Sequence, residues 1–320
     1  MSLKIDLPTN PMSEESTVGK DYLLYVAGII GTATTESWNL IGGQTGGSVD
    51  ESTDEIDVST KTSGGYKATV AGMSSWSIDF DTVAILPNSD YGIEILRRAK
   101  AQGKQVKIKI LYPDGSYRVG WATTTTYTVD TPHDKNATLK GKLSGCGPLS
   151  DYSVTVAISS ATDQTYYFNS KATATAVTLD SATVAASNYT ATTAGQITLS
   201  ASYLANLASG EYLFYVELST GGYSLIPITI TGTASISPTT ATVSIASTAN
   251  ETFTITPSKE TIASVKNGST TLTSGTDYTY SSGTLTIVST YLASLSAGTV
   301  TLTVTTTSGT ALTITLTVTA

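Results

Sequence analysis

The sequence has little of what catalytic and metal-binding sites usually require. Its 320 residues include one histidine and one cysteine, and only 13% of them are charged. A single cysteine, Cys146, has no partner for an internal disulfide or a metal cluster, so we expect a small buried or unreactive residue. No run of eighteen apolar residues occurs, which excludes a spanning helix. Residues 1–20 hold no apolar stretch flanked by basic residues, so no secretory signal is predicted.

The net charge of the chain is negative, which is the wrong sign for binding the phosphates of nucleic acid. The formal net charge is −8, and the isoelectric point is about 4.6. A protein that binds nucleic acid by neutralising phosphates needs a basic surface, so this class of function is disfavoured. With 40% hydrophobic residues, the chain still has enough apolar surface to fold. Its length fits two or three domains.

No arrangement of side chains predicts an enzyme. His133 lies in a loop-like stretch from Thr131 to Lys135, and no Gly-x-Ser-x-Gly motif supports a nucleophile. The glycine-rich stretch 42–47 is not followed by Gly-Lys-Ser/Thr, so a loop is favoured over a phosphate cradle. We therefore predict no catalytic residue and no cofactor.

Two further groups of residues leave binding open. One is an acidic cluster, which lacks the spacing of a calcium loop, so a solvated acidic surface is favoured over ion binding and no metal is predicted. It comprises Asp50, Glu51, Asp54, Glu55 and Asp57. The other is a set of tyrosines that fits either a sugar-binding surface or ordinary sandwich core. It comprises Tyr166, Tyr167, Tyr203, Tyr212, Tyr215 and Tyr223.

Charge density changes near residue 150, which predicts a domain boundary. Residues 1–150 hold 17 acidic and 14 basic residues, whereas residues 151–320 hold 8 and 3. The second segment is rich in Thr, Ser, Val and Ile in alternating runs, such as 299–304 and 313–318. Alternation of β-branched residues with period two indicates half-buried antiparallel strands.

The second segment is also internally repeated. The block Tyr203–Gly210 recurs as Tyr291–Gly298, at an offset of 88 residues, and each block is followed by alternation typical of strands. We expect each block to form a turn or a short helical crossing. Two tandem modules of immunoglobulin-like β-sandwich type are predicted, at residues 151–232 and 233–320.

The first segment predicts an α+β arrangement. Short strands are expected at 22–26, 55–59, 75–81, 106–110, 117–121 and 137–143, and residues 32–52 are expected to be a long loop. A helix is predicted between them, capped by Asn88 or Ser89 and stopped by Gly103. Its apolar side uses Ile93, Leu96 and Ala99. Acidic strands precede this helix and basic strands follow it, so opposite charges are expected to meet across subunit boundaries.

Four stretches of the first segment carry a resemblance to a known family. They are Gly19–Val26, Glu55–Lys67, Gly72–Ile78 and Leu143–Leu149. In their order and spacing, residues 1–150 resemble the major tail proteins of long-tailed phages that infect mostly Gram-positive hosts. The repeats resemble the immunoglobulin-like modules that decorate phage tail and capsid subunits.

The resemblance implies a tail-tube β-sandwich or barrel domain with one flanking α-helix in a mainly β chain. Such subunits close into hexameric rings, the rings stack through extended loops, and an acidic lumen conducts DNA without binding it. The implied partners are further copies of the chain, the tape measure protein, and the tail terminator and distal tail proteins. The implied location is the virion, after assembly in the host cytoplasm. The outer modules would obstruct a close-fitting sheath, which favours a noncontractile tail.

Two sets of residues follow from this resemblance. The candidates for lining the lumen are Asp57, Asp79 and Asp81. The candidates for contacts between rings come from segments 41–53 and 62–73, and they are Ile41, Gln44, Val49, Tyr66 and Met73. The rival hypothesis is an adhesin that binds host glycans or polysaccharide through its modules, and an enzyme is the least favoured.

Overall fold

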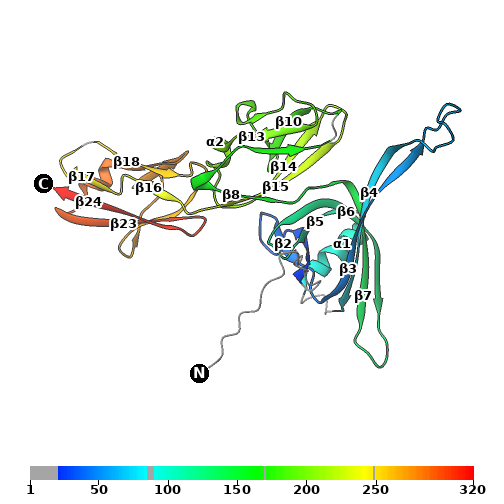
Figure 1. Cartoon of the computed structure of the whole chain (residues 1–320). Helices are drawn as coiled ribbons and strands as arrows, with labels where there is room; N and C mark the ends of the chain where they lie inside the picture. Colours follow the sequence, from blue (N-terminus) through cyan, green and yellow to red (C-terminus); the bar gives the residue numbers. More distant parts are fainter. Residues whose placement is uncertain (1–20, 85–89, 169–170, 248) are drawn as a thin grey trace, which may run out of the picture. The chain divides into compact units, whose positions relative to one another are not determined.

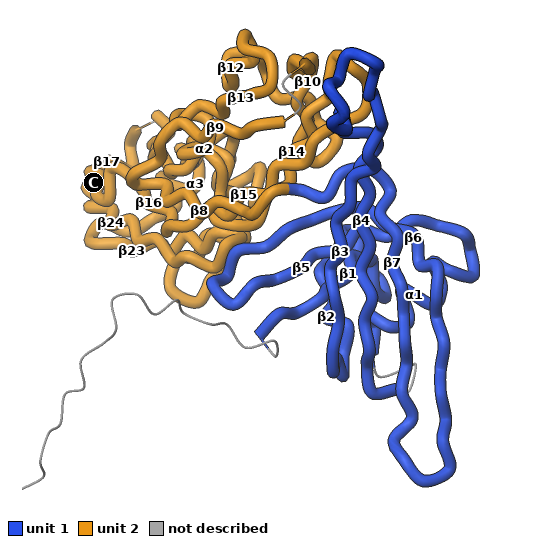
Figure 2. The backbone as a smooth tube through the Cα atoms, turned by 45° about the vertical axis from the view of Figure 1, so that its right-hand side comes forward, with its two compact units in different colours: residues 1–150 blue, residues 151–320 orange. Residues whose placement is uncertain are grey.

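The computed structural model describes residues 21–84, 90–168, 171–247 and 249–320. The chain divides into two compact units, Met1–Ser150 and Asp151–Ala320, which Figure 2 colours separately. As predicted, the chain is mainly β, and a first unit with one sheet-flanking helix of three turns is followed by β-sandwich modules.

In its described residues, the first unit has one sheet of seven strands in the order β2-β1-β5-β6-β7-β4-β3, with every neighbouring pair antiparallel. Their bounds are β1 Leu23–Gly28, β2 Ser37–Leu40, β3 Gln44–Asp57, β4 Thr69–Val83, β5 Gln105–Leu111, β6 Tyr117–Asp130 and β7 Thr138–Leu149. The β3–β4 and β6–β7 hairpins continue past the body of the sheet in opposite directions (Figure 1).

The prediction of a long loop at residues 32–52 was wrong. Strands β2 and β3 occupy most of this stretch, and β3 pairs with β4 from Gln44 to Asp57. After Gln44 every β3 side chain is exposed, so no apolar residue is needed on either face. The hydrophobic alternation that reveals a half-buried strand is therefore missing from this sequence.

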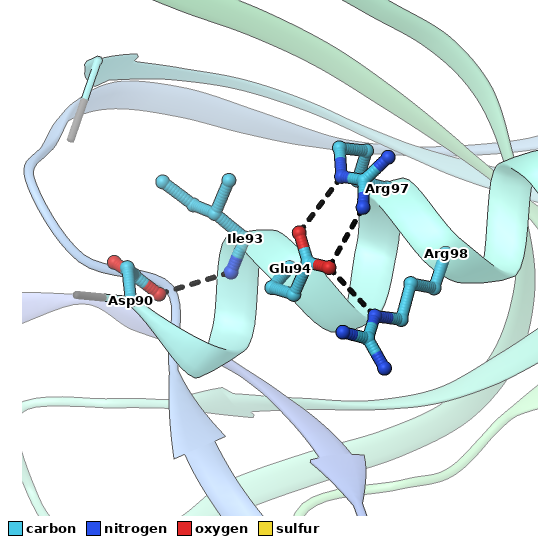
Figure 3. A network of polar contacts seen from close by, with 5 residues as sticks. All are labelled: Asp90, Ile93, Glu94, Arg97 and Arg98. Atoms are coloured by element: carbon cyan, nitrogen blue, oxygen red, sulfur yellow. Dashed lines mark hydrogen bonds and ion pairs between the residues drawn. The ribbon is translucent and has the colours of Figure 1, made fainter. Parts of the chain in front are cut away.

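The helix predicted between the strands is α1, Tyr91–Gln102. Asn88 and Ser89, the predicted caps, lie outside the described residues, and the capping carboxylate belongs to Asp90, which accepts a hydrogen bond from the Ile93 amide at 2.9 Å (Figure 3). At the other end Gly103 has φ +65° and donates to Ala99 and Lys100 carbonyls, as a helix-ending glycine does. Ile93, Leu96 and Ala99 are buried, as predicted.

The core of the first unit lies between α1 and the apolar face of the curled sheet. It includes Val26, Ile41 and Leu143, none of which has exposed surface. Trp76 on β4 covers β7, where a Cβ on Gly145 would lie 2.3 Å from the indole ring. The indole Nε1 donates to the Gly147 carbonyl at 2.9 Å. Two of the stretches that carry the family resemblance are therefore packed against each other.

The second unit begins with a sandwich of two sheets, which in the described residues have the orders β11-β10-β14-β15-β8 and β12-β13-β9. Its elements are β8 Val154–Ala157, a 3-10 turn at Ile158–Ser160, β9 Gln164–Tyr167, β10 Ala174–Leu179, β11 Ala182–Thr183, a 3-10 turn at Ala186–Asn188, β12 Tyr189–Thr190, β13 Gln196–Leu199, α2 Ala201–Leu204, β14 Gly210–Leu218 and β15 Tyr223–Thr231. Phe214, Ile197 and Ile228 lie at the centre of its core.

A second sandwich follows, with the sheet orders β20-β19-β23-β24-β17 and β16-β18-β22-β21 in the described residues. Its elements are β16 Ser235–Ser237, β17 Thr240–Ser244, β18 Glu251–Thr256, β19 Ile262–Asn267, β20 Thr270–Thr271, β21 Tyr278–Ser281, β22 Thr284–Ile287, α3 Ser289–Ala293, β23 Gly298–Thr306 and β24 Ala311–Thr319. Phe253, Leu285 and Leu302 lie in its separate core.

The two sandwiches repeat each other, except that β16 of the second has no counterpart in the described residues of the first. The pairs β10 and β19, β13 and β22, β14 and β23, and β15 and β24 all begin 88 residues apart, the offset found in the sequence. The repeated Tyr-Leu-Ala blocks form the short helices α2 and α3, whose leucines Leu204 and Leu292 are buried. In both sandwiches the first strand of the larger sheet pairs parallel to the last, as β8 with β15 and β17 with β24.

Candidate functional site

The main candidate surface is the polar face of β3, β4 and β7, which lies opposite the apolar core. On β4 the buried residues Trp76, Ile78 and Phe80 alternate with Ser77, Asp79 and Asp81. Directly paired residues of neighbouring strands project to the same face. By this rule the face also carries Asp50 of β3 and, from β7, Lys140 and Lys142. We call these six residues and Ser48 the polar face.

Acidic and basic groups meet on this face within one chain. Asp79 is paired with Lys142 in the register of β4 and β7, and the Lys142 ammonium lies 3.0 Å from the Asp79 carboxylate. Asp81 is the register partner of Lys140. The expected meeting of acidic and basic strands thus occurs at the seam between β4 and β7 of a single chain, which offsets part of the negative charge.

The three lumen candidates do not lie together. Asp79 and Asp81 are neighbours on the polar face, but Asp57 pairs with Thr69, at the far end of the β3–β4 hairpin. The twelve residues from Thr69 to Asp81 correspond to roughly 40 Å of strand. Asp57 is held locally, since its carboxylate accepts a hydrogen bond from the Ser59 amide at 2.8 Å. This bond and the Ser59 hydroxyl lower the pKa of Asp57.

Two of the predicted stacking residues serve the interior of the unit instead. Ile41 is fully buried, so it has no surface to offer a neighbouring ring. The Gln44 side chain reaches across to β1, where its amide both accepts from the Leu24 amide and donates to the Leu24 carbonyl, each at 3.0 Å. The Gln44 side chain thus makes the two hydrogen bonds that the backbone of a paired strand would make. In this way it joins β3 to β1, where the curled sheet brings these two strands close together.

The other three stacking candidates are exposed, and so are further apolar side chains of the hairpin that holds them. Tyr66 and Met73 keep 82% and 80% of their surface accessible, and Val49 keeps 39%. Ile56 and Val70 face each other across the hairpin and are also about half exposed. In the described residues β3 is paired along one edge only, with β4. The unpaired edge of this 14-residue strand offers backbone amides and carbonyls with which a strand of another chain can pair.

A bidentate ion pair that the sequence did not predict holds this strand to the body. The Arg118 guanidinium on β6 bonds to both carboxylate oxygens of Glu51, at 2.5 and 3.1 Å, and its Nε donates to the Ser150 carbonyl at 2.7 Å. Arg118 lowers the pKa of Glu51 by hydrogen bonding and by its charge. The two residues are 67 positions apart, and no local pattern in the sequence signals such a contact.

The lysines of β5 are not arranged as a surface for phosphates. The Lys107 ammonium lies 5.8 and 5.7 Å from the ring centroids of Trp38 and Trp121, and it also pairs with Glu36. Lys109 is buried among Tyr25, Trp38 and Tyr117. Aromatic faces satisfy ammonium groups in this way. The cluster therefore supports the sheet rather than offering free positive charge.

The residues considered for chemistry lie apart. His133 is exposed in the turn of the β6–β7 hairpin. The Cys146 thiol lies on β7, with its Sγ 3.1 Å from the Thr123 hydroxyl. Among the described residues, no group of three or more His, Cys, Asp or Glu side chains is placed to hold a metal ion. In the same residues, no helix is both long enough and apolar enough to cross a membrane.

Most of the tyrosines considered for sugar binding support the first sandwich. Tyr203 packs edge-on against Phe214, with ring centroids 6.2 Å apart. The Tyr212 hydroxyl donates to the Ala208 carbonyl at 3.0 Å, and burial raises the pKa of this residue to about 12. Tyr167 differs, because 76% of its surface is exposed on β9. The set is therefore mainly core material rather than one continuous platform.

Comparison with known families gives one match in each unit. Residues 16–151 match the family described as phage tail tube protein. Residues 236–316, within the second sandwich, match the family described as carbohydrate binding domain X2. A curated relative, cellulose-binding protein A of Clostridium cellulovorans, is 38% identical over 85 residues, which is 27% of this chain but only 4% of that protein.

Solved structures similar to parts of the chain include tail tubes and a cellulase. The virion of a native gene transfer agent particle contains a chain that is 21% identical, with 42% of this chain and 98% of that chain covered and a TM-score of 0.36. The SPP1 tail tube is 16% identical, with 41% and 77% covered and a TM-score of 0.34. A tri-modular endo-β-1,4-glucanase from Bacillus licheniformis is 17% identical, with 52% and 37% covered and a TM-score of 0.29.

The match over residues 16–151 confirms the resemblance that their sequence stretches carry. Over these residues, the first unit matches the phage tail tube protein family.

Proposed function

We propose that this chain is the major tail tube subunit of a phage, a structural virion protein that forms stacked hexameric rings. The match of residues 16–151 to the tail tube family carries this proposal. In it the central channel conducts DNA and the tape measure protein during ejection, and the tail terminator and distal tail proteins bind the two ends of the tube. Assembly takes place in the host cytoplasm. The proposed tail is noncontractile, since two outer modules would obstruct a sheath.

The unpaired edge of β3 supports ring formation. The second half of this strand, from Asp50 to Asp57, is exposed on both faces and has β4 on one side only. Pairing with a strand of a neighbouring copy would satisfy these backbone groups and extend the sheet from subunit to subunit. Repetition of one such heterologous contact closes a ring when the rotation between copies fits.

The polar face supports an acidic channel. Asp50, Asp79 and Asp81 carry three carboxylates against the two ammonium groups of Lys140 and Lys142. A net negative wall repels phosphates at short range, so DNA passes it without being held. Local pairing of Asp79 with Lys142 leaves Asp81 as the more effective charge. We therefore propose Asp81 and Asp79 as lumen residues, and Asp57 as part of the projecting hairpin.

The exposed apolar side chains of the hairpin support stacking. Tyr66 lies in the turn between β3 and β4 and Met73 lies on β4, and each keeps about four fifths of its surface accessible. Apolar groups on a projecting hairpin indicate a contact surface. We propose that these two residues and Val49 lose their exposure between successive rings.

Two measurements on the virion or on assembled protein test the proposal. Electron microscopy of the assembled chain is expected to show tubes of stacked rings with six-fold symmetry. The double variant Asp79→Lys, Asp81→Lys is expected to assemble but to deliver DNA less efficiently, and Asp79→Asn, Asp81→Asn serves as a size-matched control without charge reversal. Normal infectivity of the lysine variant would remove these residues from the channel wall.

A second function is proposed for the outer modules. The match of residues 236–316 to a carbohydrate binding domain favours polysaccharide binding by the second sandwich. This activity is compatible with a tube subunit, because a module on the tail surface can hold host glycans while the tube conducts DNA. The adhesin hypothesis then applies to the second sandwich rather than to the whole chain.

Sedimentation with insoluble polysaccharides tests this second function. The full chain is incubated with cellulose and with purified Gram-positive cell wall, and bound protein is measured against a chain that ends at Gly232. Binding that disappears with residues 233–320 supports the proposal. Equal binding by both chains assigns it elsewhere, and no binding at high protein concentration refutes it.

A further inference from the structure

Two exposed segments of the first unit carry opposite charge. Residues 50–57, which form the second half of β3, hold five acidic side chains and no basic one. Residues 97–104, at the end of α1 and directly after it, hold four basic side chains and no acidic one. All nine of these charged residues are exposed. The basic ones are Arg97, Arg98, Lys100 and Lys104.

The acidic segment is held away from the helix of its own chain. Strand β3 pairs with β4 from Gln44 to Asp57, and Figure 1 shows this hairpin running out from the body of the sheet, where α1 lies. The residues from Thr69 to Asp81 alone correspond to roughly 40 Å of strand. A paired ladder of this length does not fold back onto α1. The two charged segments therefore meet only between copies of the chain.

Near its end the hairpin separates acidic from apolar side chains. Glu55 and Asp57 lie two positions apart in a regular part of the ladder and so share one face, while Ile56 between them points to the other. Lys67 lies 3.0 Å from Glu55 and offsets one of the two charges. The Ser59 hydroxyl and amide lower the pKa of Asp57, which therefore keeps its charge. The acidic face thus retains negative charge for a partner.

The basic side of α1 has available donors and an exposed ring. One carboxylate, Glu94, binds both Arg97 and Arg98, at 2.7 and 2.6 Å (Figure 3), so two guanidinium charges share one negative charge. Arg98 gives only its Nε to this carboxylate, and its side chain is 69% exposed. Tyr91, two turns earlier on the same side of the helix, is 60% exposed. Arginine and tyrosine are the residue types that contribute most to interfaces.

We propose that the acidic face of the hairpin, around Glu55 and Asp57, docks on the basic side of α1, around Arg98 and Lys104, of a second copy in the next ring. The inference rests on the proposed function, because it names the surface that receives the hairpin when rings stack. Every copy carries both surfaces, so a contact between these unlike surfaces repeats from ring to ring. Docking uses the side chains of β3, whereas pairing within a ring uses its backbone edge, so both contacts form together.

Charge reversal with rescue tests the proposal in the full chain. Glu55→Lys with Asp57→Lys reverses the hairpin, and Arg97→Glu with Arg98→Glu reverses the helix. Each pair alone places like charges opposite each other, so the fraction of chain that sediments as tubes is expected to fall by about tenfold or more. The four substitutions together restore opposite charges, and they are expected to return this fraction to within about threefold of the wild-type value. Electron microscopy is expected to show single rings in both reversed variants.

Two controls separate docking from folding and from net charge. Asp130→Lys with Asp134→Lys makes the same change of charge on the β6–β7 hairpin, where both aspartates are exposed, and it is expected to leave tube formation unchanged. The new glutamates of the helix variant repel Glu94, so its folding is checked by circular dichroism. Rescue by substitutions on the hairpin cannot come from repair of a damaged helix, because the hairpin does not touch the helix of its own chain.

The outcomes separate this inference from the proposed function. Tubes that form equally well with either reversed pair overturn the docking and leave the tube itself in place. Loss of tubes that the fourfold variant does not restore also overturns the docking, as does an equal loss in the β6–β7 control. A wild-type chain that forms no tubes overturns the proposed function and this inference with it.

Discussion

The two units of this chain differ in how the edges of their sheets are paired. Each sandwich of the second unit buries its apolar side chains between its own two sheets, and Figure 1 shows its strands as short elements connected by turns. The first unit has, in its described residues, one sheet and a projecting 14-residue strand that is paired along one edge, and it holds most of the charge of the chain. Under the proposed function, the first unit is completed by other copies of the chain, whereas each sandwich of the second unit is complete within itself.

The largest expected effect comes from separating the units. A chain that ends at Ser150 is expected to form tubes, and a chain of residues 151–320 is expected to stay monomeric, because the free strand edge and the exposed hairpin belong to the first unit. Analytical ultracentrifugation and electron microscopy measure both. Assembly by the second fragment would contradict this difference between the units. So would a first fragment that circular dichroism shows to be folded but that stays monomeric.

Core truncations provide the next test, since each unit has its own core. Phe253→Ala removes a fully buried ring from the second sandwich and is expected to cost about 3–5 kcal/mol of unfolding free energy. Tube formation should survive it. Leu96→Ala, at the contact of α1 with the sheet, is expected to cost about 2–5 kcal/mol and also to reduce assembly. Denaturant unfolding and sedimentation measure the two effects, and assembly lost equally in both variants would contradict the separation.

A smaller effect is expected from the ion pair that holds β3. Because Arg118 lowers the pKa of Glu51, the unfolded chain binds more protons than the folded chain in acid. The contribution of the pair is present above the usual pKa of a glutamate and is lost as pH falls through the lowered value. At this exposed site it amounts to less than about 1 kcal/mol.

The control is Glu51→Gln, which cannot lose a proton. Unfolding free energies of both proteins are measured by urea titration between pH 6 and pH 3. The wild-type chain should lose more stability than the variant over this range, whereas parallel curves would show that the pair contributes nothing.

The smallest expected effect concerns the contact between the two sandwiches. Asn206 of the first accepts from the Ser258 hydroxyl of the second at 3.1 Å, and its carbonyl accepts from the Lys259 amide at 3.1 Å. The position 88 residues later is Ser294. Asn206→Ser keeps the backbone bond and is expected to cost about 0.5–1.5 kcal/mol. Thermal unfolding of residues 151–320 measures it, with Ser294→Asn as the matched control that should have no such effect.

The sequence predicted the elements that follow local rules. The repeat at 88 residues, the helix with its buried Ile93, Leu96 and Ala99, and its stop at Gly103 all depend on residues close together in the chain. Alternation also separated Asp79 and Asp81 from the core, because β4 is half buried there. These features appear in the structure as predicted.

Contacts between residues that are far apart in the chain could not be predicted from the sequence. The strand β3 carries no hydrophobic alternation, since both its faces are exposed, and so its sequence resembled a loop. The role of Gln44 depends on the curl of the whole sheet, which brings β1 and β3 together. The pairing of Asp79 with Lys142 depends on a register between strands 63 residues apart. Only the folded sheet sets these distances.

Cryo-electron microscopy of tubes assembled from the full chain tests the central claim most directly. The account predicts stacked six-fold rings in which β3 of one copy pairs with the sheet of the next, Asp79 and Asp81 face the channel, and residues 151–320 lie outside. A channel lined by the sandwiches, or rings joined without any strand pairing at β3, would contradict it.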